Sequence, residues 1–231
     1  MRLCPWEKLP ESLRIPEVKP YYDILRKKGF QLFCKRVFDI FASLALLLIL
    51  CPAFIILAIA IKIDSKGPVF YRQVRVTQYG KTFRIHKFRS MCDGADQKGS
   101  LVTTDHDMRV TKVGRFIRKF RLDEISQLLD ILSGNMTFVG TRPEVPKYVA
   151  QYTPEMMATL LLPAGVTSEA SISYKDEETL LKNTEDTDVT YVEAVLPEKM
   201  KYNLNAIKNF TLWGEFKLMI KTITAVLSYE K

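Results

Sequence analysis

Ile40 to Ile61 reads IFASLALLLILCPAFIILAIAI and carries no charged side chain. As a straight helix this stretch would be about 33 Å long, which is enough to cross a hydrocarbon core of about 30 Å. An uncharged run of this length exceeds what a helix in a soluble core usually needs. The stretch therefore predicts a helix that lies in a membrane.

Two features of this stretch favour a helix that enters the bilayer, bends and returns. Pro52 removes a backbone donor near the middle and favours a kink. Basic residues lie on both sides: Arg26, Lys27, Lys28, Lys35 and Arg36 before it, and Lys62 and Lys66 after it. The positive-inside rule is then best satisfied when both ends are cytoplasmic. A kinked helix that spans the membrane remains the alternative, because proline is tolerated in such helices.

These features divide the chain into three predicted parts. They are an N-terminal basic segment (1–33), a re-entrant membrane helix hairpin broken at Pro52 (34–63), and a cytoplasmic domain (64–231). The first residues are polar and proline-rich, so we do not expect a signal peptide there.

The amino-acid composition limits the classes of possible binding partner. The 231 residues carry a net charge of +8, from 34 basic and 26 acidic residues. Such a charge suits nucleic acid, anionic lipid or a phosphorylated substrate. No compact basic run, zinc-finger spacing or RNA-binding aromatic motif is present, so we expect no nucleic-acid partner. The four scattered cysteines have no metal-ligand spacing and fit a reducing compartment.

The rest of the chain predicts an α/β fold of the α+β kind, rich in helices. Val69–Val76 and Lys81–Met91 have strand-like composition around a short turn and predict a β-hairpin. We expect a further helix within Pro143–Leu162. At the C-terminus an amphipathic pattern predicts a helix on the membrane interface or packed on the core. Its apolar positions are Trp213, Phe216, Ile220, Ile223 and Leu227.

Asp123 and Glu124 are the strongest candidates for chemistry. They follow the cations Arg115, Arg118, Lys119 and Arg121. Carboxylates beside guanidiniums suit reactions at phosphorus, and we expect the cations to keep Asp123 ionised. Apolar positions from Ile125 to Leu132 predict a helix that begins at the acids and ends at Ser133-Gly134. The alternative is that both acids only cap that helix.

The two histidines, His86 and His106, are isolated in the sequence. We expect both to be solvated or hydrogen-bonded rather than catalytic.

Several motifs together resemble those of the bacterial sugar transferases, also called monotopic phosphoglycosyl transferases. The matching motifs are Lys35-Arg36-Val37-Phe38-Asp39, Gly67-Pro68-Val69-Phe70-Tyr71-Arg72-Gln73, Lys87-Phe88-Arg89-Ser90-Met91, Leu122-Asp123-Glu124 and Gly134-Asn135-Met136-Thr137-Phe138-Val139-Gly140-Thr141-Arg142-Pro143. Their order and spacing fit over about residues 34–227. The chain looks like the short form of the family, without added membrane helices or an N-terminal domain.

The resemblance implies transfer of a phosphosugar from a UDP-sugar to a polyprenol phosphate such as undecaprenyl phosphate, with release of UMP. It implies that Asp123 is the nucleophile, that Glu124 assists, and that both acids hold Mg²⁺. Arg118 and Arg142 would bind phosphate, as would Lys87. The implied location is the cytoplasmic face of the bacterial inner membrane, with the bilayer as a partner and an oligomer possible.

The chain departs from the family pattern in three places. Ser126 and Thr141 stand where proline is usual, and the pattern around Pro163 to Ser168 is only partly kept. Two other functions remain open: a Mg²⁺-dependent phosphohydrolase of lipid pyrophosphates, and a non-enzymatic scaffold that binds anionic lipid.

Overall fold

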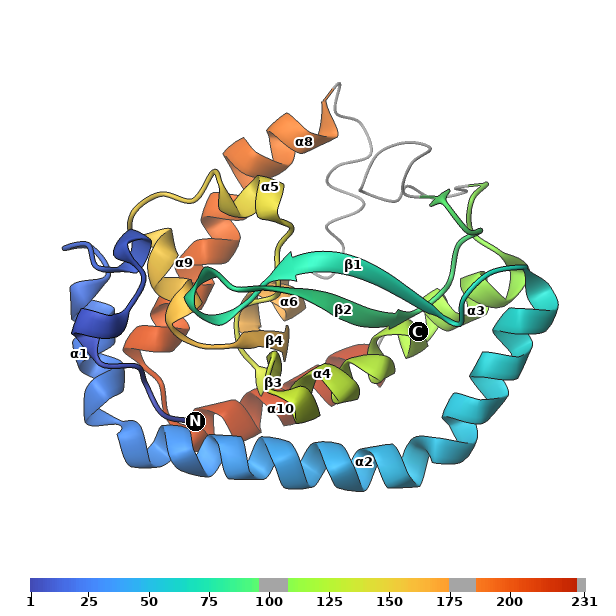
Figure 1. Ribbon diagram of the computed structural model, residues 1–231, viewed down its shortest axis with the longest axis horizontal. Coiled ribbons are helices and arrows are strands. Elements are labelled where there is room, and N and C mark those ends of the chain that lie inside the picture. The colour runs from blue at the N-terminus through green and yellow to red at the C-terminus, as the bar shows by residue number, and fades with distance from the viewer. Residues whose placement is uncertain (96–107, 175–185, 228–231) are drawn as a thin grey trace.

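The computed structural model describes residues 1–95, 108–174 and 186–227. Helices in these residues surround two small two-stranded sheets (Figure 1). This arrangement confirms the predicted helix-rich α+β fold. The strands are β1 Phe70–Val76, β2 Thr82–Phe88, β3 Met136–Val139 and β4 Ala164–Thr167. The helical elements are η1 Trp6–Lys8, η2 Glu11–Leu13, α1 Lys19–Lys27, α2 Gly29–Asp64, η3 Gln78–Gly80, α3 Lys112–Lys119, η5 Leu122–Gln127, α4 Leu128–Ser133, α5 Pro146–Val149, η6 Met156–Leu161, α6 Glu169–Ser173, α8 Thr187–Thr190, η7 Tyr191–Val195, α9 Leu196–Lys208 and α10 Leu212–Leu227.

The apolar stretch forms one long helix, α2, with Pro52 inside it. It begins at Gly29 rather than at residue 34 and is the one helix in the described residues that is long and apolar enough to cross a membrane. Figure 1 shows α2 running along one edge of the molecule and then bending toward α3. The helix continues through Pro52, so α2 is one bent helix and not two separate helices.

Both ends of α2 are held by the same domain. At its end, the Asp64 carboxylate accepts a hydrogen bond from the Val113 amide at the start of α3, 2.9 Å away. The Arg89 guanidinium, 4% exposed, donates to the carbonyls of Ser65, 2.8 Å away, and Lys66, which caps the last turn.

A buried polar cluster holds the beginning of α2; we call it the helix anchor, and it consists of Lys35, Asp39, Thr137 and Glu215. Lys35 Nζ lies 2.6 Å from a Glu215 carboxylate oxygen on α10 and 2.9 Å from the Val139 carbonyl. Asp39 accepts a hydrogen bond from Thr137 Oγ1, at 2.7 Å. Lys35 and Asp39 are 2% and 1% exposed. Each buried charge therefore has a hydrogen-bonded partner, as buried charges require.

The surface of α2 that faces away from the domain is apolar. In the most apolar part of the helix, only 11% of the residues are buried within the protein. Neighbouring α10 also exposes apolar side chains, because Trp213, Ile220 and Ile223 are 61–70% exposed. Exposed apolar side chains in this number indicate contact with a membrane or a partner. The exposed large side chains on α2 are Phe30, Phe33, Val37, Phe41, Leu44, Leu46, Leu48, Ile49, Ile55, Ile56, Ile59 and Ile63.

The predicted β-hairpin is confirmed. Strands β1 and β2 pair antiparallel, with Tyr71 opposite Lys87 and Arg75 opposite Phe83. A second, parallel pair, β3 and β4, was not predicted. Next to it, Gly140 and Gly165 approach so closely that a Cβ on Gly165 would lie 2.2 Å from the Gly140 amide nitrogen. This contact brings the segment after β3, which carries Arg142, against β4.

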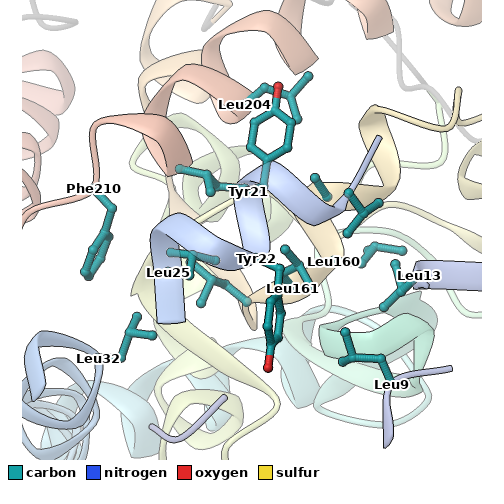
Figure 2. Packing of buried hydrophobic residues seen from close by; sticks show 14 of the residues in the cluster. Leu9, Leu13, Tyr21, Tyr22, Leu25, Leu32, Leu160, Leu161, Leu204 and Phe210 are labelled. Atoms are coloured by element: carbon teal, nitrogen blue, oxygen red, sulfur yellow. The ribbon is translucent and has the colours of Figure 1, made fainter. Parts of the chain in front are cut away.

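The N-terminal segment is packed into the domain. Side chains from η2 and α1, including Leu13, Tyr22 and Leu25, share a hydrophobic core with Leu161 of η6 and Leu204 of α9 (Figure 2). Burial of this much apolar surface stabilises the segment in its place. Residues 1–33 therefore belong to the same packed unit as the domain that follows α2.

The helix predicted within Pro143–Leu162 is present only as two short pieces, α5 and the 3₁₀ helix η6. Pro146 begins α5, as proline does well in a first helical turn. The four cysteines are free. His106 lies outside the described residues, and His86 is hydrogen-bonded to Asp130.

Candidate active site

Three segments bring together the residues that the sequence singled out. Lys87 comes from β2, Asp123 and Glu124 lie in η5, and Arg142 lies in the loop after β3. Lys87 Nζ is 3.8 Å from Asp123 Oδ2 and 3.6 Å from Glu124 Oε1. Arg142 forms a salt bridge with the same oxygen of Glu124. The predicted dyad and two of the three predicted phosphate-binding residues thus form one cluster.

The position of the acids differs from the prediction. They lie in the first turn of the 3₁₀ helix η5, and the α-helix α4 starts only at Leu128. The hydroxyl of Ser126 lies 3.1 Å from the Asp123 carbonyl and 3.0 Å from the His86 carbonyl. Such a local side-chain bond competes with regular helix geometry. The predicted end at Ser133-Gly134 is confirmed, because Gly134 adopts the left-handed conformation with φ 89°.

Arg118 lies in the last turn of α3, close enough for its charge to lower the pKa of Asp123. Between them, Arg121 has φ 50°, a left-handed conformation that is uncommon for a residue with a side chain. This turn redirects the chain from α3 into η5, and the charges of both Arg118 and Lys87 act on Asp123.

The environments of the two acids drive their pKa values apart. Burial would raise the pKa of Glu124, but the positive charges of Arg142 and Lys87 outweigh it and hold the pKa far below its usual range. Burial raises the pKa of Asp123, and Lys87 and Arg118 offset this only in part. A pair of carboxylates separated in this way commonly divides two chemical roles.

The nearby cations oppose this rise but do not reverse it, and the ionisation of Asp123 stays a prediction. Glu124 takes the salt bridge with Arg142, and the negative charge of Glu124 adds to the effect of burial on the pKa of Asp123. Burial also lowers the pKa of Lys87. Asp123 is thus the more basic carboxylate of the two, and its side chain is 17% exposed.

A hydrogen-bonded pair, His86 and Asp130, lies next to the cluster on β2 and α4. The Asp130 carboxylate, 1% exposed, accepts the backbone N–H of His86 and lies 2.8 Å from its Nδ1. This fixes α4 against β2 directly beside Lys87. His86 thus has a hydrogen-bond partner, as the sequence analysis expected.

Two charged residues near the cluster, Arg75 and Glu144, were not predicted from the sequence. A small pocket is lined by Arg75, Ile85, Lys87, Gln127, Arg142 and Pro143. Arg75 lies on the same face of the hairpin as Lys87, because Tyr71, Gln73 and Arg75 share one face of β1 and Tyr71 is opposite Lys87. Glu144, 7% exposed, directly follows Pro143 in the sequence and accepts a hydrogen bond from Tyr191 at 2.6 Å. No periodic signal marks Glu144, because it lies in a loop.

The residues that could hold a metal ion are the two acids of the dyad. In the described parts of the chain, no group of three or more His, Cys, Asp or Glu side chains gathers at one point. Mg²⁺, however, is usually bound by one or two carboxylates and completes its ligand set with water and substrate phosphates. Asp123 and Glu124 match this donor set.

Comparison with known proteins identifies relatives. The family described as bacterial sugar transferase matches residues 30–229. A UDP-N-acetylgalactosamine-undecaprenyl-phosphate N-acetylgalactosaminephosphotransferase of Aeromonas hydrophila is 35% identical over 199 residues, which are 85% of this chain and 44% of the relative. A UDP-glucose:undecaprenyl-phosphate glucose-1-phosphate transferase of Klebsiella pneumoniae is 32% identical over 199 residues, 84% of this chain and 40% of the relative.

The chain thus spans less than half the length of these two relatives. It matches the uncharacterized sugar transferase EpsL of Bacillus subtilis over most of both proteins, with 35% identity over 85% of this chain and 88% of the relative. The family match covers both α2 and the charged cluster. The chain belongs to the bacterial sugar transferase family.

Proposed function

We propose that this protein transfers a sugar phosphate from a UDP-sugar to a polyprenol phosphate and releases UMP. One observation carries the proposal: two acids with separated pKa values lie among Lys87, Arg118 and Arg142, in a domain whose long helix α2 exposes an apolar surface. Such a site suits a soluble phosphorylated donor and an acceptor phosphate carried on a lipid. The relatives named above act on undecaprenyl phosphate by their names.

The proposed reaction has two displacements at one phosphorus atom. A carboxylate oxygen of Asp123 attacks the β-phosphorus of the donor, and the bond from that phosphorus to the bridging oxygen breaks. UMP leaves with the electron pair, and the sugar phosphate stays on Asp123 as an acyl phosphate. An oxygen of the polyprenol phosphate then attacks the same phosphorus, which yields the polyprenyl diphosphate-sugar and restores the carboxylate.

The raised pKa of Asp123 supports its assignment as nucleophile. The more basic carboxylate holds its electron pair less tightly, whereas Glu124 is committed to Arg142 and Lys87. Lys87, Arg118 and Arg142 would stabilise the charge that spreads over the phosphate oxygens during each displacement. The guanidiniums suit two phosphate oxygens at once, and Lys87 acts as a point charge.

Mg²⁺ fits this site through Asp123 and Glu124, together with oxygens of the bound diphosphate. When bound, the ion supplies positive charge that stabilises the departing phosphate. Glu124 remains ionised because its pKa is low, so it keeps its affinity for cations across the working pH range.

We further propose that the protein lies on the cytoplasmic face of the bacterial inner membrane, with α2 entering and leaving from that side. Support comes from the contacts at both ends of α2, where the helix anchor and Arg89 attach it to one domain. A helix that crossed the bilayer would place these contacts on opposite sides.

Cysteine labelling tests this placement. In a variant without the four native cysteines, single cysteines replace exposed Glu17, before α2, and exposed Lys81, in the hairpin turn. Both positions should react with an impermeant reagent only after the inner membrane is opened. Labelling of position 17 in intact spheroplasts would establish a spanning helix.

Release of UMP tests the reaction itself. Full-length protein in nanodiscs, supplied with Mg²⁺ and a panel of UDP-sugars, should make UMP and lipid-linked diphosphate sugar together when undecaprenyl phosphate is present. Consumption of a lipid pyrophosphate without a donor sugar would favour the phosphohydrolase. No turnover with any donor, but binding to anionic vesicles, would favour the scaffold. The sugar is left to the panel, because the relatives' names specify different sugars.

A further inference from the structure

Arg75 differs from the other cations around the pocket. Lys87 and Arg142 each pair with a carboxylate of the dyad. Among the described residues no carboxylate lies within salt-bridge distance of Arg75, and its buried Nε has no hydrogen-bond partner. A guanidinium that is largely removed from water without an anion is unfavourable. Its environment therefore favours an anionic ligand.

Contacts hold Arg75 in place beside Arg142. Its Nη1 donates to the Pro143 carbonyl at 3.0 Å, and its Nη2 donates to Gln73 Oε1 at 2.6 Å. The next residue of β1, Val76, donates its amide to the Glu144 carbonyl at 2.9 Å. These bonds hold β1 along the segment that carries Arg142. The remaining N–H groups of the Arg75 guanidinium can donate hydrogen bonds to a ligand.

The acid whose charge acts most strongly on Arg75 is Glu144, which has other partners. Burial lowers the pKa of Arg75, Glu144 opposes this shift, Arg142 adds to it, and the net pKa is lowered. Glu144 itself accepts from Tyr191 and lies 3.8 Å from Lys199 Nζ on α9. Two guanidiniums are thus held near each other at one pocket, with one of them committed to Glu124.

Resting on the proposed function, we infer that Arg75 binds the phosphate of the leaving UMP. The phosphorus under attack must lie at Asp123, next to Lys87 and Arg142. A diphosphate then places its second phosphate one bridging oxygen away from the dyad. Arg75 lines the same pocket as Lys87 and Arg142 and has no contact with the dyad. Its position and its unpaired charge both match the second phosphate.

Inhibition by UMP and by uridine separates this role from a merely structural one. In Arg75→Ala, the inhibition constant for UMP should rise about tenfold to hundredfold, because a charge-assisted phosphate contact is lost. The constant for uridine, which has no phosphate, should stay the same, and so should the KM for undecaprenyl phosphate. Arg75→Lys should restore part of the affinity for UMP. The measurements use full-length protein in nanodiscs.

Arg72→Ala is the matched control. Arg72 lies on the same strand as Arg75 but is exposed, and its guanidinium donates to the Arg84 carbonyl. It should leave both constants unchanged. Equal weakening of UMP and uridine in Arg75→Ala would overturn the inference in favour of a structural role. A selective rise in the KM for undecaprenyl phosphate would overturn it in favour of the acceptor. A wild-type protein that neither releases UMP nor is inhibited by it would instead contradict the proposed function.

Discussion

The helix anchor and the dyad cluster use the same kinds of charged residues in opposite ways. In the anchor, Lys35 is 2% exposed and shares its protons between Glu215 and a backbone carbonyl. In the cluster, Lys87 lies between two carboxylates at 3.6 and 3.8 Å, beyond hydrogen-bond distance of either. Lys35 of the anchor is thus hydrogen-bonded to protein partners, whereas the ammonium group of Lys87 in the cluster remains available to a substrate phosphate.

This difference separates stability from chemistry. A buried pair with good geometry holds elements together, and breaking it leaves an uncompensated charge. In the dyad cluster, burial raises the pKa of Asp123 and lowers that of Lys87, so the charged form of each group is disfavoured, and binding of a phosphate and a metal ion can offset this cost. Substitutions in the two clusters should therefore affect different measurements.

The largest effect is expected from Asp123→Asn. Because a neutral amide is a poor nucleophile at phosphorus, turnover should fall on the order of a thousandfold or more. The melting temperature should be unchanged or higher, since the substitution removes an unfavourably buried charge. Measurement of UMP release and of thermal unfolding on the same preparation checks both. Substantial remaining activity would remove Asp123 from the proposed role.

Lys35→Met should show the reverse pattern. It leaves Glu215 without its cation in a largely buried site, so the free energy of unfolding should fall by about 3–5 kcal/mol. Protein that remains folded should keep its KM for the donor. Lys201→Ala, which breaks an exposed pair with Glu198, is the control and should cause no measurable change. A similar decrease in the free energy of unfolding in both variants would mean that the buried ion pair of the anchor stabilises the protein no more than an exposed pair does.

The smallest effect concerns pH. Because the pKa of Asp123 is raised, kcat/KM should fall as the pH drops through a value above the ordinary aspartate pKa of about 3.9. In Lys87→Met the residual activity should show this acid limb at still higher pH, since the cation that opposes protonation is gone. A pH–rate profile of both proteins checks the shift. An acid limb that moves to lower pH would contradict the electrostatic account.

Local patterns predicted much of the fold. Uncharged composition identified α2, alternation identified the hairpin, and Gly134 marked the end of α4. The pairing of β3 with β4 was missed because both strands are four residues long and depend on the close approach of Gly140 and Gly165. Such contacts between distant segments leave no periodic signal.

The site was predicted less completely. The motif residues were found because acids and cations lie near each other in the sequence, and the fold brings Lys87 and Arg142 to them. The direction in which the Asp123 pKa shifts depends on burial and on the salt bridge that Arg142 forms with Glu124. Neither can be read from the spacing of residues in the sequence. Arg75 was missed because it joins the pocket only through the register of the hairpin.

The central claim is that Asp123 carries the sugar phosphate during the reaction. Intact-mass spectrometry of the full-length protein, incubated with the preferred UDP-sugar and Mg²⁺ but without acceptor, tests it most directly. The account predicts a mass increase of one sugar phosphate, mapped to Asp123, which disappears when undecaprenyl phosphate is added. Asp123→Asn should show no increase. Acceptor-dependent turnover without any adduct, or an adduct on Glu124, would contradict the account.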